Sequence, residues 1–361
     1  MRRLTTFLTA SALIATGMAQ AASPTTAWKE VVRPDEAQAF PKFVEIINYN
    51  QGEQARRAGA APARGFHAKH HTALTAEFRV LPDLPDHARQ GVFKEARSYP
   101  CWVRLSNGVG VVQGDRKPDV RGLAIKLMDV PGAKLLPGEE SATTQDFLMT
   151  NSPTTPARDG VQFMAFAEGS LDLLKMPVIL AKRLGAKEAL RMLTALARST
   201  ARPIRSMAIE TFWSGAAVKY GPYAARYFVK AADASRPPLS SFGSTDYLRA
   251  EFADRLGKMD LRWDFFVQFY VDETKTPIED TSIEWKEELA PPVKVAELIV
   301  RQRDLKSQAA IQADTAGNGF AYTPWHAVEE HRPLGHLQRL RKAVYAGSAR
   351  YRGRTAEPVA R

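Results

Sequence analysis

Hydrophobic and polar positions alternate in several short runs that are separated by long stretches of chain. Three strands are predicted in the first half, at 73–80, 101–106 and 122–128. A later run, 263–271, is aromatic and alternating, and we expect 278–285 to pair with it across the turn at 272–277. Strands this far apart in the sequence predict a sheet assembled from distant segments.

Helical spacing of apolar residues marks two other regions. Leucines and methionines three and four apart predict a helical insertion over 170–200, broken at Pro177 and again near Gly185. The stretch from Pro333 to Tyr345 repeats this spacing and predicts an amphipathic helix. Helices inserted between returning strands indicate an α+β fold, and the strands can close into an antiparallel barrel that has no free edges.

The N-terminus has the layout of a secretory signal peptide. Arg2 and Arg3 precede an apolar run over 7–18, and an Ala-Gln-Ala triplet follows the run. A transmembrane helix needs about 20 residues, so this run is short for one, and retention as a membrane anchor is the alternative reading. We expect residues 1–21 to be removed and residues 22–361 to form one exported domain, periplasmic or secreted, without a stable membrane anchor.

Composition narrows the partners. The chain has 361 residues, 45% of them hydrophobic, and a formal net charge of +11. Lysine and arginine are spread along the chain and form no basic block, which argues against a nucleic-acid partner. Buried arginines can instead bind an anionic cofactor. The one cysteine, Cys101, lies in an apolar run beside Trp102, so we expect a buried thiol.

Arg341 and Tyr345 lie four residues apart in the last predicted helix. That spacing puts a guanidinium beside a phenol oxygen, where the positive charge favours the phenolate, a ligand for a metal ion. An isolated pair of this kind is also common on protein surfaces. Arg350 and Arg352 extend it to the pattern R-x-x-x-Y-x-x-x-x-R-x-R.

This pattern resembles the haem-ligand helix of catalases. The resemblance implies that Tyr345 is the axial ligand of the haem iron, that Arg341 bonds to its oxygen, and that Arg352 binds a haem propionate. It also implies a catalase-like antiparallel barrel with surrounding helices. We expect a minimal form without the C-terminal helical region where many catalases bind a nicotinamide cofactor.

Other segments repeat the resemblance in the same order along the chain. Arg64-Gly65-Phe66-His67 is similar to the catalase segment with the distal histidine and a propionate-binding arginine, which implies those roles for His67 and Arg64. Val103-Arg104-Leu105-Ser106 is similar to the strand that provides a second propionate arginine and a serine bonded to the distal imidazole. Arg104 and Ser106 take those positions.

Two further stretches match with departures. Residues 119–126 resemble the R-D-x-R-G-x-A-x-K stretch of catalases without its first arginine. In 146–166, Phe163 matches a phenylalanine that packs on a pyrrole ring, but Thr150 stands at the position of the distal asparagine, with Asn151 next to it. Phe66 replaces the valine that usually precedes the distal histidine. Both departures bear on turnover.

The implied function is a haem enzyme, with haem b as cofactor, that reacts with hydrogen peroxide or a small hydroperoxide. His67, Ser106 and Thr150 are the expected catalytic residues, and a separate electron donor and the oligomeric state are left unidentified by the sequence. The alternatives are an enzyme acting on organic or fatty-acid hydroperoxides and a haem-binding protein with little turnover. His67, His70 and His71 also have the spacing of a zinc or copper site.

Overall fold

A computed structural model describes residues 24–233, 235, 243–353 and 357; the predicted signal peptide 1–21 lies outside them. The helices are α1 Glu36–Ala58, α2 Gly160–Gly169, α3 Met176–Leu184, α4 Ala186–Thr200, α5 Tyr247–Leu256, α6 Gln308–Gly319 and α7 His336–Tyr351. The strands are β1 His70–Val80, β2 Ser98–Asn107, β3 Arg121–Leu127, β4 Gln145–Thr150, β5 Phe212–Trp213, β6 Val218–Tyr220, β7 Tyr223–Ala231, β8 Leu261–Phe269 and β9 Val293–Val300. The α+β prediction is confirmed.

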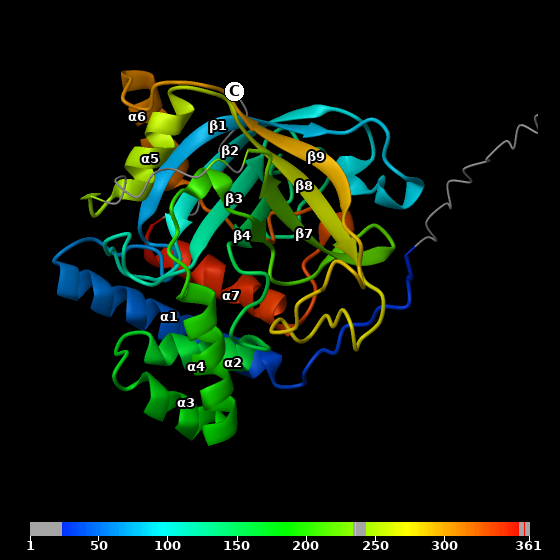
Figure 1. The fold of residues 1–361 in the computed structure, drawn as a ribbon. Helices are drawn as coiled ribbons and strands as arrows, with labels where there is room; N and C mark the ends of the chain where they lie inside the picture. The colour runs from blue at the N-terminus through cyan, green and yellow to red at the C-terminus, as the bar shows by residue number, and fades with distance from the viewer. Residues whose placement is uncertain (1–23, 234, 236–242, 354–356, 358–361) are drawn as a thin grey trace, which may run out of the picture.

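The sheet closes on itself as an antiparallel barrel (Figure 1). Its strands follow the order β5-β4-β3-β2-β1-β9-β8-β7, and the short strand β5 pairs with both β4 and β7, which completes the ring. Strand β6 is attached to β7 outside this ring. Closure leaves the long strands without unpaired edges, as expected from the number of separated strands.

Apolar side chains fill the barrel because alternate residues of each strand point inward. The centre is aromatic: Phe78 and Phe265 are fully buried, with ring centroids 5.2 Å apart, and Phe147 lies 5.2 Å from Phe265. Along each strand, the residues that alternate with these inward-pointing side chains point outward. On β2, for example, Val103 and Leu105 belong to the core whereas their neighbours face the helices.

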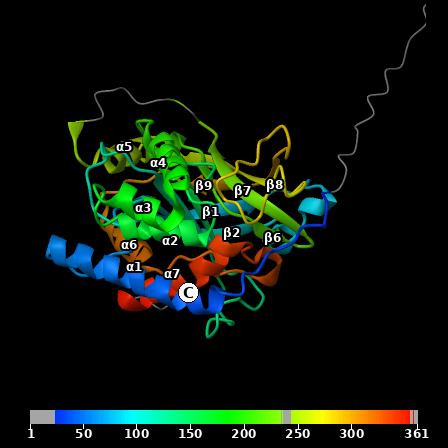
Figure 2. The same ribbon diagram turned by 90° about the horizontal axis from the view of Figure 1, so that it is seen from below.

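Three helices cover one outer side of the barrel. In Figures 1 and 2, α7 (red) and α1 (blue) run side by side below the strands, with α2 against them. Ile47 of α1, Met164 of α2, and Leu340 and Val344 of α7 form the apolar cluster between these helices. None of the helices in the described ranges combines the length and the apolar character needed to cross a bilayer.

The predicted strand 278–285 is wrong. Strand β8 pairs instead with β9, residues 293–300, and 278–285 forms turns. The segment has apolar residues only at 278, 283 and 285, and its polar side chains bond to nearby backbone: Asp280 Oδ1, for example, accepts from the N–H of Ser282 at 2.9 Å. Local bonds of this kind compete with a strand ladder.

The helical insertion is confirmed with a different first break. Pro177 does not interrupt a helix; it lies in the first turn of α3, where its missing N–H costs nothing. Gly185 separates α3 from α4, as expected from the sequence, with a φ of 83°. The last helix begins at His336, three residues after Pro333.

Candidate functional site

Arg341 and Tyr345 meet on α7 as their spacing predicts. The Nε and Nη2 atoms of Arg341 donate to Tyr345 Oη at 3.2 and 3.0 Å, and its Nη1 donates to Gln338 Oε1 at 2.9 Å. No carboxylate of the described residues forms an ion pair with Arg341 within 4 Å. Its charge is therefore directed at the phenol oxygen, which has the donor chemistry of an anionic metal ligand.

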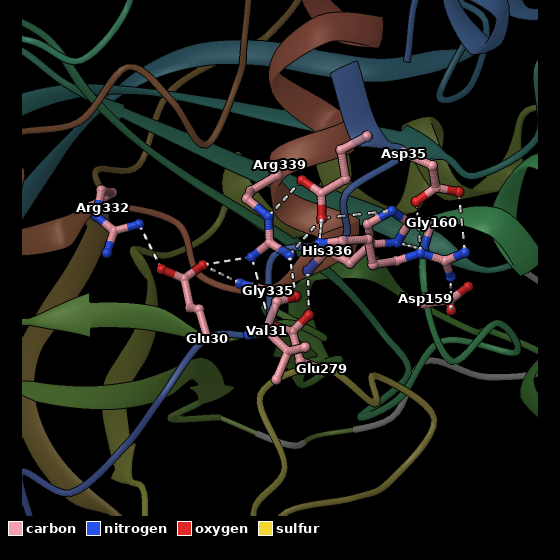
Figure 3. Close-up of polar contacts among 12 residues, drawn as sticks. Glu30, Val31, Asp35, Asp159, Gly160, Glu279, Arg332, Gly335, His336 and Arg339 are labelled. Carbon is pink, nitrogen blue, oxygen red and sulfur yellow. Dashed lines mark hydrogen bonds and ion pairs between the residues drawn. The ribbon is translucent and has the colours of Figure 1, made fainter. Parts of the chain in front are cut away.

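The start of α7 is fixed by carboxylates from distant segments (Figure 3). Arg339 Nη1 lies 2.7 Å from Glu30 Oε1, and its Nη2 and Nε lie 2.8 and 2.9 Å from the two oxygens of Glu36. Glu279 accepts from the backbone N–H of His336 at 2.6 Å. Negative charge is favourable at a helix N-terminus, where N–H groups lack helical partners and the dipole is positive. The network fixes the helix that bears the phenol.

His336 also connects α7 to the start of α2 (Figure 3). Its Nδ1 accepts from the backbone N–H of Gly160 at 3.0 Å, and the preceding Asp159 caps α2 by accepting from the N–H of Gln162. A side chain at Gly160 would lie 2.9 Å from Leu340 Cδ2 and 3.0 Å from the His336 ring. The glycine therefore permits the close approach of α2 to α7.

His67 lies just before β1 in an unusual backbone conformation. Its φ of 58° falls in the left-handed region that residues other than glycine rarely adopt. Its N–H donates to Gly108 O at 2.8 Å, and Arg104 Nη2 donates to its carbonyl oxygen at 2.9 Å. Its Nδ1 lies 3.1 Å from Ser106 Oγ. These contacts orient the ring and leave Nε2 for another partner.

The barrel wall under His67 is formed by one row of residues across three strands. Ser106 of β2 is paired with Gly122 of β3, and Gly122 is paired with Thr150 of β4. A Cβ at Gly122 would lie 2.6 Å from His67 Nδ1 and 2.8 Å from Ser106 Oγ. Because paired residues face the same side of a sheet, Thr150 is on the His67 side.

The neighbouring Asn151 does not face this row. Its Oδ1 accepts from the backbone N–H of Arg121 at 2.6 Å, and its Nδ2 donates to Glu210 at 3.1 Å. Adjacent residues on a strand point to opposite faces, so the amide one position later cannot replace the missing asparagine. Thr150 is the residue present beside His67, with its hydroxyl 3.4 Å from the carbonyl oxygen of Ser152.

The electrostatic surroundings keep the His67 imidazole neutral. Burial, followed by the positive charges of Arg104, Arg341 and Arg64, lowers the pKa of His67 to about 3. His67 as a whole residue is partly exposed. The influence of Arg341 also shows that the phenol side and the imidazole side of the site are close enough to interact.

Two of the predicted propionate arginines share one amide oxygen. Arg104 Nε and Arg64 Nη1 donate to Asn318 Oδ1 at 3.0 and 3.2 Å. Arg104 is 4% exposed, and burial together with the charge of Arg352 lowers its pKa to about 10. Among the described residues, no carboxylate forms an ion pair with Arg104. Such a cluster of cations is suited to an anionic group.

Aromatic side chains connect these two parts. The ring of Phe66 lies 5.3 Å from that of Phe163 and stacks 6.1 Å from Phe166. Phe66, Phe163 and Tyr345 pack on the same apolar cluster, which contains Val344. The structure thus brings together the segment before β1, α2 and α7, which contain most of the predicted site residues.

The geometry does not support the zinc or copper site that the spacing of His67, His70 and His71 offered as an alternative. The three rings are bonded to different partners, Ser106 Oγ, Asp314 Oδ2 and Asn107 Oδ1 respectively. They contribute to no potential metal-binding cluster within the described residues. Cys101 is buried, and burial raises the pKa of its thiol, which fits the predicted structural role.

Two residues near the site were not predicted. Asn318 lies at the end of α6 within Gly317-Asn318-Gly319, and a polar residue between two glycines was the signal available. The hydroxyl of Tyr322 donates to Gly317 O at 2.9 Å, and the charge of Arg104 acts on its pKa, although burial raises that pKa overall. Both are brought to the arginines by α6.

Solved catalases have the same fold. A bacterial catalase matches with a TM-score of 0.60 and 18% identity over 98% of this chain and 68% of its own. Catalase A from Saccharomyces cerevisiae matches with 0.62 and 18% over 83% and 63%, and a fungal catalase with 0.63 and 16% over 92% and 65%. The chain thus spans 63–68% of their length. No family model and no curated protein matches the sequence.

Proposed function

We propose that this chain is an exported haem enzyme that decomposes hydroperoxides, with hydrogen peroxide as the main substrate. The contact between Arg341 and Tyr345 Oη is the observation on which the proposal depends. A phenol bonded twice by a guanidinium, with no carboxylate in an ion pair with that guanidinium among the described residues, matches the donor chemistry of a haem iron ligand. The fold of the solved catalases adds support.

The three predicted propionate arginines fit the propionate end of haem. Haem has two propionates, and Arg64, Arg104 and Arg352 would hold them. Phe163 would pack on the porphyrin face. Bound haem would supply a ferric iron that reacts with peroxides, and the protein would supply position and electrostatics.

His67 would move the proton of the substrate. Its Nδ1 is held by Ser106 Oγ, so Nε2 is the nitrogen available to accept a proton from one peroxide oxygen and return it to the other. A pKa of about 3 keeps this imidazole able to accept a proton at any pH near neutrality. Thr150, in the row beneath His67, would contact the second oxygen.

The test is haem binding by a Tyr345→Phe variant. We expect the purified chain to show a Soret band after loading with haem, and the variant, which lacks the phenol oxygen, to bind haem at least about tenfold more weakly. Tyr351→Phe is the matched control, because Tyr351 ends the same helix and is exposed. An unchanged spectrum and affinity in Tyr345→Phe would exclude the proposed ligand.

Thr150 favours oxidation of a separate donor over oxygen release from two peroxides. A hydroxyl is shorter than the amide at this position in catalases, and Asn151 points away. Dye oxidation should therefore exceed oxygen evolution, and Thr150→Asn should raise oxygen release relative to dye oxidation. If the ratio does not change, Thr150 does not set this balance.

Organic hydroperoxides are the second candidate substrates. Phe66 next to His67 stacks on Phe166 and contacts Phe163, which makes the surroundings of the imidazole apolar. Apolar surroundings favour a substrate with a hydrocarbon portion. Comparing rates with hydrogen peroxide and a fatty-acid hydroperoxide distinguishes the two, and a haem-loaded chain that is slow with both would be a binding protein.

A further inference from the structure

A buried group of ionisable residues lies on the barrel wall, outside the proposed haem site. His326, 2% exposed, is located in the loop between α6 and α7, next to Lys126 of β3 and Asp146 of β4. Glu139, from the loop before β4, and Glu357, after α7, approach it from the opposite side. Four separate segments of the chain thus converge on one imidazole.

The inner side of the group contacts Nδ1 of His326. Its Nδ1 lies 2.8 Å from Asp146 Oδ2, and Asp146 is ion-paired with Lys126 at 2.8 Å. Lys126 Nζ has further acceptors in Asp146 Oδ2 and Glu357 Oε2, at 3.0 and 2.7 Å. His326 Nδ1 lies within hydrogen-bond distance of both Asp146 Oδ2 and Lys126 Nζ, at 2.8 and 3.1 Å. When Nδ1–H donates to Asp146, the lone pair of a neutral ring lies on Nε2.

That lone pair faces two carboxylate oxygens. Nε2 lies 2.8 Å from Glu139 Oε2 and 3.3 Å from Glu357 Oε1, and ligand atoms of the three residues lie within 4.8 Å of one another. Both oxygens are buried, and apart from His326 no described residue forms a hydrogen bond with either of them. The Glu357 side chain is only 10% exposed. Two carboxylate oxygens and a nitrogen lone pair in such close contact require a positive charge between them.

We propose that His326 Nε2, Glu139 and Glu357 bind one divalent metal ion of the zinc type, with Asp146 as the carboxylate that orients the histidine. Metal bonds of about 2.0–2.2 Å at octahedral or tetrahedral angles place neighbouring ligands about 2.8–3.6 Å apart, and both Nε2 distances fall in that range. Imidazole with two carboxylates suits Zn²⁺ better than Ca²⁺ or Mg²⁺, which prefer six or more oxygen ligands.

The charges agree with this ion. With a neutral imidazole, the single cation Lys126 faces three carboxylates, and a divalent ion compensates the two remaining negative charges. Bound metal would link the segment after α7 to the barrel wall, close to the end of the helix that bears Tyr345. The alternative cation is a protonated His326, whose one N–H on this side can serve only one of the two oxygens.

The experiment is titration of the full purified chain with ZnCl₂ after treatment with a chelator, by calorimetry and by metal analysis. We expect one Zn²⁺ per chain, at least tenfold weaker binding in Glu139→Gln and in Glu357→Gln, and no competition from Ca²⁺. Glu140→Gln is the matched control, because Glu140 neighbours Glu139 but bonds to the backbone of Gly138. It should bind like the wild type.

The proposal would be overturned if the chain bound no stoichiometric Zn²⁺, or if both glutamine variants bound Zn²⁺ as tightly as the wild type. The protonated histidine would then be the cation. Circular dichroism of each variant checks that it is folded, and Glu139, at 28% exposure, is the milder change. Zinc binding needs no haem. A missing Soret band and a missing zinc site are therefore separate results, and neither decides the other.

Discussion

At the residue scale, Gly122 is a position where the barrel wall approaches the His67 imidazole closely. The ring of His67 occupies the space that a β-carbon would need, and Ser106 Oγ fills the rest. Gly122 is not in a left-handed conformation, so its role is to make room and not to permit a turn. The orientation of His67 thus depends on an absent side chain.

Gly122→Ala should therefore displace His67 without removing any proposed haem contact. We expect peroxide turnover to fall by about 10²-fold, the lower range for loss of a positioned acid–base group, while the Soret band is retained. Stopped-flow measurement of the reaction with hydrogen peroxide gives the rate. Gly114→Ala is the control, because an added Cβ there lies 3.7 Å from Thr245, an ordinary contact. Full turnover in Gly122→Ala would show that His67 can move without consequence.

At the element scale, α7 is positioned mainly by its first turn. Arg339 is 13% exposed and balances Glu30, Glu36 and Glu279, all three from segments distant in the sequence. Tyr345 follows less than two turns later. A shift of the first turn would therefore shift the phenol as well.

Arg339→Met should leave Glu36 and Glu279 without their arginine partner, whereas Glu30 keeps its ion pair with Arg332 at 2.7 Å. We expect a loss of roughly 3 kcal/mol in the free energy of unfolding, as for removal of one partner from a buried charge group. Urea denaturation of both proteins measures it. Arg301→Met is the control: Arg301 is 50% exposed and pairs with Glu77 and Asp260, and its loss should cost less than about 1 kcal/mol. Similar losses in the two variants would contradict the role given to Arg339.

Strands and helices with a strong period could be predicted from the sequence, and weakly periodic ones could not. Strands β1, β2, β3 and β8 alternate clearly and were predicted within a few residues. Helix α1 was not predicted, because it contains Pro41 and because polar residues interrupt its apolar ones. One of these polar residues, Asn50, is buried, and its side-chain amide donates to Ala167 O. Its helical state depends on packing against α7, which no local pattern contains.

The contacts of the candidate site likewise divide into those that the sequence could predict and those that it could not. The Arg341–Tyr345 contact follows from helix geometry alone, and it is confirmed. The haem roles of the predicted residues stay predictions. The sharing of Asn318 by Arg64 and Arg104 depends on α6 crossing the barrel wall, a contact between residues more than 200 positions apart. Tertiary contacts of this kind leave no trace in the spacing of residues.

At the scale of the whole molecule, several buried histidines make stability depend on pH. Burial is the main cause that lowers the pKa of His67 to about 3 and that of His71 and His331 to about 4. Each titrates near 6.5 when unfolded. Below pH 6.5 the unfolded chain therefore binds more protons than the folded one, so stability is present above that pH and is lost as the pH falls.

The haem-free chain should lose at least about 4 kcal/mol of stability per pH unit near pH 5, because these three histidines alone take up about three protons on unfolding. His326 acts in the opposite sense, since its pKa is raised, but near pH 5 it is protonated in both states and adds no slope. Urea midpoints at pH 5.0, 5.5 and 6.0 measure the effect. His331→Gln should reduce the slope by about one third; an unchanged slope would show that His331 is not neutral in the fold.

The proposed site residues lie both before and after the barrel strands in the sequence. Their order along the chain therefore determines when during synthesis a cofactor could be bound. Arg64 and His67 precede β1, whereas the phenol of Tyr345 lies on α7, after β9. A growing polypeptide possesses the imidazole and the complete barrel wall before α7 has been made. Under the proposed function, haem that arrived before α7 would lack Arg341, Tyr345 and Arg352, so its loading would need a nearly finished chain.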